Sequence, residues 1–112
     1  MIRDRLAALE ARMTATEYHG YRLLTMEARG EDPGIAAMIT KLFGTQLGYD
    51  ITKTALDVLS DRAALAPSES NPMGMFVNAY MWSLGILIAG GTANIQRNII
   101  AERGLGMPRD KK

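Results

Sequence analysis

The residues best suited to do chemistry stand near the C-terminal end, at Gly90-Gly91-Thr92. Two adjacent glycines let a ligand approach the backbone closely, because neither has a Cβ. Thr92 is a typical helix N-cap, so the backbone N–H groups of Ala93, Asn94 and Ile95 would have no partners inside the helix that follows. These groups lie at the positive end of the helix dipole, and the Thr92 and Asn94 side chains add further hydrogen-bonding groups. The segment therefore predicts an anion-binding site.

The same residues fit a second, purely structural interpretation. In it, Gly90-Gly91 is a turn between two packed helices, and Thr92 is only the N-cap of the second helix. Residue types and spacing alone favour this structural interpretation, and the anion-binding site stays open as the alternative.

The other candidate residues favour structural roles. Glu10 and Glu17 stand seven positions apart and would share a helix face, but a solvated face explains them more simply than paired catalytic carboxylates. His19 is the single histidine, and it fits packing better than general-base catalysis. Arg97 suits a structural ion pair, with a phosphate contact as the alternative. Three methionines fit core filling better than a flexible pocket: Met73, Met75 and Met81.

Composition excludes several classes of protein. A length of 112 residues indicates one domain, which we place at 1–112. The chain holds 13 basic and 12 acidic residues, and this balance argues against nucleic acid as a partner. The absence of cysteine excludes disulfides, cysteine-ligated zinc and thiol nucleophiles, so we expect no metal site.

Targeting and membrane signals are weak. The mixed charges of Met1–Arg5 do not resemble a signal peptide, so we expect a cytoplasmic protein. The stretch 70–96 has no charge, but polar residues, glycine and proline interrupt it before it reaches the length of about 20 apolar residues that a membrane helix needs. We therefore expect no membrane span, and we keep a small membrane protein as an alternative.

Apolar spacing predicts four helices. The first runs over 2–29 and stops at Gly30, and the second begins at Asp32-Pro33 and ends near 62–65. A loop over 66–72 leads to a third helix over 73–88, and the fourth begins at Thr92 and ends near Gly104. Helices joined by short loops imply an all-α fold, an antiparallel four-helix bundle.

The segment 91–103 carries a resemblance to a known family. It reads Gly-Thr-Ala-Asn-Ile-Gln-Arg-Asn-Ile-Ile-Ala-Glu-Arg and is similar to the C-terminal signature of acyl-CoA dehydrogenases, Gly-Thr-x-x-Ile-Gln-Arg-x-Ile-Ile-Ala-x-Arg. Less specific similarity extends upstream through Tyr21–Leu24, Lys41–Phe43 and Thr45–Leu47. The resemblance covers nearly the whole chain but only the C-terminal helical domain of a full-length member, without its first helix.

The resemblance implies a function. Members of this family are FAD flavoproteins of fatty acid metabolism, oxidoreductases that convert acyl-CoA to 2-enoyl-CoA. Their C-terminal domain builds subunit interfaces and completes the FAD site. By the same resemblance, the cofactor-binding residues of this chain would be Gly91, Thr92, Ala93 and Asn94.

Three departures from the family pattern affect catalysis. Many members place a catalytic glutamate directly before the Gly-Thr pair, and that position here is Gly90, which cannot abstract a proton. The family's Gln-x-x-Gly-Gly flavin-contact stretch maps near 57–61, where its glycines are lost, and Leu84 replaces a common arginine. We therefore assign no catalytic residue to this chain and expect it to be inactive in isolation.

The expected partners follow from this interpretation. We expect a homo-oligomer, together with the remaining domains or a partner subunit of an acyl-CoA dehydrogenase. Acyl-CoA would be the substrate of the complete enzyme, and nucleic acid would not be a partner. The alternative function is a non-catalytic assembly subunit or fragment that only oligomerises.

Overall fold

The computed structural model describes residues 1–109, with the side chains of Ala63 and Ala64 left aside. Its long helices are α1 (Ile2–Ala28), α2 (Gly34–Leu59), α4 (Met75–Ile88) and α5 (Ala93–Gly104). Two short elements lie between α2 and α4, the helix α3 (Asp61–Ala64) and the 3₁₀ turn Pro72–Gly74. No strand occurs within residues 1–109, so the predicted all-α class is confirmed.

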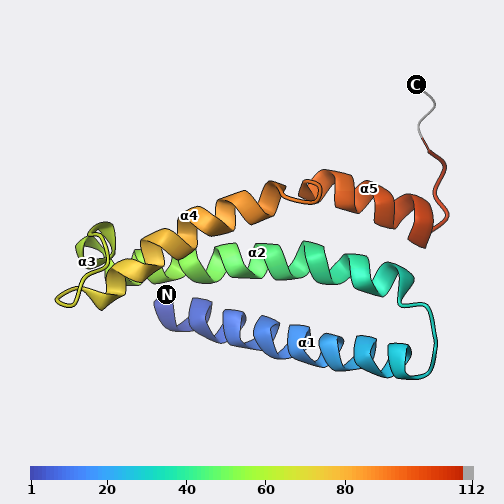
Figure 1. Cartoon of the computed structure of the whole chain (residues 1–112), viewed down its shortest axis with the longest axis horizontal. Coiled ribbons are helices and arrows are strands. Elements are labelled where there is room, and N and C mark those ends of the chain that lie inside the picture. The colour runs from blue at the N-terminus through green and yellow to red at the C-terminus, as the bar shows by residue number, and fades with distance from the viewer. Residues whose placement is uncertain (110–112) are drawn as a thin grey trace.

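Helix α2 lies at the centre of the molecule (Figure 1). Helix α1 runs antiparallel to it on one side, while α4 and α5 follow one another along its other side (Figure 1). The 3₁₀ turn with α4 meets α5 at a bend of 40°. The four predicted helices therefore form a layer three helices wide, here called the helix layer, in which neighbours are antiparallel.

Local signals explain most of the helix ends. Gly30 has a φ of +70°, which ends α1 as expected, and the Asp32 carboxylate accepts a hydrogen bond of 2.9 Å from the Gly34 N–H at the start of α2. The predicted end of α2 near 62–65 is wrong. The helix stops at Leu59 because Ser60 has φ +48° and ψ −130°, and this backbone turns the chain away from the helix axis into α3.

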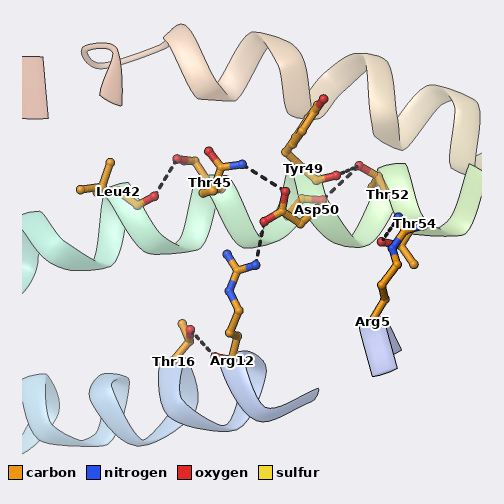
Figure 2. Close-up of polar contacts among 11 residues, drawn as sticks. Arg5, Arg12, Thr16, Leu42, Thr45, Tyr49, Asp50, Thr52 and Thr54 are labelled. Atoms are coloured by element: carbon orange, nitrogen blue, oxygen red, sulfur yellow. Dashed lines mark hydrogen bonds and ion pairs between the residues drawn. The ribbon is translucent and has the colours of Figure 1, made fainter. Parts of the chain in front are cut away.

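Polar contacts join α1 to α2 (Figure 2). Arg12 donates to Asp50 at 2.7 Å, and Arg5 donates to Asp57 at 2.7 Å and to the Thr54 hydroxyl at 3.0 Å. Both ion pairs are about one-third to one-half exposed, so each contributes roughly 0.2–1 kcal/mol. Their main effect is to set the register of the two helices.

Helix α4 packs on α2 through a pair of hydroxyl groups and a pair of tyrosine rings. The Thr52 and Ser83 hydroxyls lie 3.3 Å apart, and the rings of Tyr49 and Tyr80 have centroids separated by 5.7 Å. The neighbouring Tyr49 hydroxyl, followed by burial, raises the pKa of Tyr80, because both favour its neutral form. Four residues of α4 that recur at spacings of three and four share one face and are half-buried: Phe76, Tyr80, Leu84 and Leu87.

The hydrophobic core is thin. Among the described side chains, the large apolar ones that are fully buried are Leu9 and Leu47. The accessible surface is 8394 Å², whereas a compact monomer of this mass exposes about 6,100 Å². The radius of gyration is 17.4 Å, against about 13 Å for a compact chain of this length. The helix layer therefore leaves much of its apolar surface uncovered.

The methionines illustrate this directly. Met73, Met75 and Met81 are 41%, 57% and 62% exposed, so the expectation that they fill the core is wrong. Within residues 1–109, no single helix combines the length and hydropathy of a membrane span. The bent pair Pro72–Ile88 and Ala93–Gly104 reaches those values only when both segments are taken together.

The backbone of Ser60 gives a test of local strain. We predict that Ser60→Gly raises the free energy of unfolding by about 1 kcal/mol, because positive φ at this ψ strains any residue with a Cβ by roughly 1–3 kcal/mol. Part of that gain is offset by the extra freedom of glycine in the unfolded chain. Ser60→Ala, which keeps the Cβ, is the control. Thermal unfolding at matched protein concentration measures both, and equal stabilities of the two variants would contradict the prediction.

Candidate functional site

The turn between α4 and α5 has the backbone that the Gly-Gly pair predicts. Gly90 has φ +67° and Gly91 has φ +103°, a region that residues with a Cβ rarely adopt. Thr92 follows with φ −63° and ψ 163°, the extended conformation of an N-cap, and α5 begins at Ala93. The Gly-Gly break and the helix start after it lie where the sequence analysis placed them.

Two side chains hold this turn from inside the helix layer. Lys41 of α2 donates from Nζ to the Gly91 carbonyl at 2.6 Å, and Gln96 of α5 donates from Nε2 to the Gly90 carbonyl at 2.7 Å. Gln96 is buried, with 9% of its surface exposed. Both carbonyl groups therefore point toward the protein.

Neither Lys41 nor Gln96 is among the site residues predicted from the sequence. Lys41 is the only charged residue between Gly34 and Tyr49, and Gln96 is a polar residue at a helix position that proves to be buried. Both features can be noticed in the sequence, but neither predicts which carbonyl group the side chain would bind.

The opposite edge of the turn is open. Among residues 1–109, the N–H groups of Thr92, Ala93, Asn94 and Ile95 have no hydrogen-bond acceptor. Thr92 is exposed and its hydroxyl makes no capping hydrogen bond, so the expected side-chain cap is wrong although the residue occupies the N-cap position. The hydroxyl and the backbone donors are thus free to bind a ligand.

The remaining predicted site residues lie beside these donors. Ala93 is half-buried as the first residue of α5, and Asn94 is exposed. The Asn94 side-chain oxygen accepts a hydrogen bond of 3.2 Å from Arg97. Arg97 pairs with no carboxylate within residues 1–109, so the expected ion pair is wrong; its guanidinium orients the Asn94 amide instead.

The position before the Gly-Thr pair has space but no functional group. A Cβ placed on Gly90 would meet nothing closer than the Lys41 Cε atom, at 3.9 Å. A Cβ therefore has room here, although the φ of +67° would strain any residue that carries one, and glycine itself supplies neither an acid nor a base.

The other candidates stay in structural roles. His19 Nε2 lies 2.8 Å from the Ala36 carbonyl oxygen and joins α1 to α2. Glu10 and Glu17 are exposed on α1, where Glu17 accepts a hydrogen bond from the Tyr21 hydroxyl at 2.9 Å. In the part of the chain that the structure describes, no three histidine or acidic side chains gather to hold a metal ion.

Comparison with known proteins now decides the family. The profile of the family described as "Acyl-CoA dehydrogenase, C-terminal domain" matches residues 1–105. The chain belongs to the acyl-CoA dehydrogenase family. This family generally uses FAD, and the helices and the Gly-Gly turn described above are its C-terminal domain.

Curated relatives and solved structures agree with this assignment. The acyl-CoA dehydrogenase IpdE1 of Mycobacterium tuberculosis is 34% identical over the whole chain, and FadE34 of the same organism is 31% identical over 95% of it. The solved structure titled "Tcur3481-Tcur3483 steroid ACAD" has a TM-score of 0.85 at 24% identity over 97% of the chain. The chain spans 28% of the IpdE1 length and 29% of that solved chain. It is thus similar to one domain of these larger proteins.

Replacement of Gly91 tests the backbone of the turn. Gly91→Ala is expected to lower the free energy of unfolding by about 2 kcal/mol, since alanine would be strained at this φ. In addition, its Cβ would lie 3.0 Å from the Gln96 Nε2 atom. Gly106→Ala is the matched control, because Gly106 has φ +64° and open space around it. Denaturant unfolding that shows equal losses for both variants would contradict the role of the Gln96 contact.

Proposed function

We propose that residues 1–112 are one domain of an FAD-dependent acyl-CoA dehydrogenase that oxidises acyl-CoA thioesters to 2-enoyl-CoA thioesters. In this proposal the domain supplies part of the FAD site and an interface to other domains or subunits. The observation that carries it is the turn before α5. Its Gly90 and Gly91 carbonyls are held inward, while the N–H groups of Thr92 and of the first residues of α5 are free.

Gly91, Thr92, Ala93 and Asn94 are the residues that we propose to contact FAD. The free N–H groups at the start of α5 suit the anionic pyrophosphate of a dinucleotide. A helix start contributes roughly 0.3–1 kcal/mol toward an anion, and each hydrogen bond to a charged group contributes roughly 1.5–3 kcal/mol. When bound, FAD supplies the redox chemistry by accepting a hydride. The domain's own part is to hold and orient the cofactor.

The proposal assigns proton abstraction to residues outside this chain. Gly90 occupies the position of the family's usual glutamate and has no side chain. A positioned general base contributes about 10²–10⁴-fold to rate, so the isolated chain is expected to be inactive. The base therefore comes from another helix or subunit of the assembled enzyme.

The name of the solved relative suggests a class of substrate and a kind of partner for this chain. That relative is named as a steroid ACAD, and its name joins two designations, Tcur3481 and Tcur3483. We extend both properties to this chain as proposals: an acyl-CoA with a bulky ring system as the substrate, and a separate partner subunit that completes the enzyme.

The interface is proposed on one face of the helix layer, here called the apolar face. On α2 it consists of residues that recur at spacings of three and four and carry no charge: Gly44, Gly48, Ile51, Ala55 and Val58. They line two grooves, one walled by Trp82 and Ile86 of α4 and one by Leu6 of α1 and Phe76 of α4. Trp82 is 71% exposed there.

The area of uncovered surface supports a large interface. The chain exposes about 2,300 Å² more than a compact monomer of its mass. A standard protein interface buries about 800 Å² on each partner. The excess exceeds that value more than twofold, which favours a permanent assembly, including self-association, over a transient contact.

Flavin binding tests the proposed site. In the assembled flavoprotein that contains this chain, Thr92→Ala and Asn94→Ala are expected to weaken FAD binding about tenfold each, the effect of losing one hydrogen bond to a charged group. Thr92→Ser keeps the hydroxyl and should bind like the parent. Fluorescence titration with FAD measures the affinity.

Stability provides the control for this test. The Thr92 hydroxyl makes no capping bond, so Thr92→Ala should leave the unfolding temperature nearly unchanged. If Thr92→Ala and Asn94→Ala bind FAD like the parent, the turn is a structural connection, and the assembly-subunit alternative is favoured.

Association tests the apolar face. We expect the parent chain to self-associate and Trp82→Glu to weaken association at least about tenfold, because a charge would be buried at a central aromatic contact. Thr14→Glu is the matched control, since it adds the same charge to an exposed position of α1. Light scattering over a concentration series measures the species present. A parent that stays monomeric at high concentration would contradict self-association.

A further inference from the structure

Lys41 makes an unusual contact for a lysine in a helix interface. Its ammonium reaches across 50 residues of sequence to the Gly91 carbonyl at 2.6 Å. The side chain is half-buried, and among residues 1–109 it forms no ion pair with a carboxylate. A cation removed in part from water is thus bound to a backbone carbonyl, where it restrains the conformation of the turn.

The planarity of the peptide bond extends this restraint to Thr92. In a trans peptide, the C=O of one residue and the N–H of the next point in opposite directions. Because the Gly91 carbonyl points toward Lys41 on α2, the Thr92 N–H points away from α2. That N–H has no acceptor among residues 1–109.

Other contacts around the turn hold its remaining parts in place, so Lys41 restrains only a small part of the backbone. Gln96 holds the preceding carbonyl, that of Gly90, at 2.7 Å, and the Gly91 N–H donates to the Ile88 carbonyl at 3.2 Å. At the far end of α5, a Cβ on Gly104 would lie 2.8 Å from Ile35 Cδ1, so that end is packed closely against α2. Loss of the Lys41 contact would therefore leave α5 docked and release only the Gly91–Thr92 peptide.

We infer that Lys41 is a positioning residue that turns the Thr92 N–H outward to meet the anionic part of the flavin dinucleotide. The inference rests on the proposed function, since it concerns the same site. Lys41 acts through the backbone of the turn and does not itself contact the ligand.

The experiment is FAD titration of the assembled flavoprotein with variants at Lys41. Lys41→Met should raise the Kd for FAD about tenfold, and Lys41→Arg, which keeps a charged donor, should restore most of the affinity. Lys53→Met is the matched control, because Lys53 lies on the same helix, is exposed and makes no contact with the turn. If Lys41→Met does not fold, Lys41→Gln replaces it, since it also removes the charge.

A double-mutant cycle separates positioning from general stability. Release of the Gly91–Thr92 peptide would displace the Thr92 side chain together with its N–H. Lys41→Met with Thr92→Ala should therefore lose less affinity than the product of the two single losses. Independent, multiplying effects would overturn the inference. So would a Lys41→Met protein that binds FAD like the parent, or a Lys41→Arg protein that binds as poorly as Lys41→Met. A parent that does not bind FAD would overturn the proposed function, and this inference with it.

Discussion

Helix α2 packs on two opposite sides at once, and the rest of the molecule depends on this arrangement. On one side, Asp50, Thr54 and Asp57 contact α1. On the other side, Thr52 contacts α4, and Lys41 contacts the turn that leads into α5. A helix that packs on two opposite sides leaves its other two sides for outside contacts. The helix layer is therefore a flat unit that a partner can cover.

The turn at Gly90-Gly91 depends on the same central helix. Its glycines permit the positive φ angles, but the direction of its carbonyls is set by Lys41 on α2 and Gln96 on α5. This places a row of backbone donors on the outer edge of the turn while the inner edge is satisfied. Structural packing and the proposed FAD contact thus use opposite edges of the Gly91–Thr92 peptide, so a packed turn and a ligand site are compatible.

The thin hydrophobic core can be explained by the small share of its relatives' length that this domain represents. The chain spans less than a third of its relatives' length, and in a longer protein one domain has surfaces that face the others. Permanent interfaces of proteins are more apolar than the rest of the surface, because burial of apolar area stabilises them. In this chain the consequence is that Trp82 and three methionines of the 73–81 region stand exposed, whereas a self-contained bundle would bury them.

The sequence by itself determined the helices, the family and the place of the Gly-Gly turn, because helix periodicity, glycine, proline and a 13-residue signature are local properties of the chain. It also marked 57–61 as a departure from the family, and within that stretch Ser60 has a positive φ. Only the tertiary structure decided the break at Ser60, the unused Thr92 cap and the Asn94 partner of Arg97. The contacts of Lys41 and Gln96 also depend on the tertiary structure. Each side chain binds a backbone carbonyl whose direction depends on how α5 docks on α2. Burial of the apolar faces was decided in the same way, since periodicity shows that a face is apolar but only packing shows whether anything in the chain covers it.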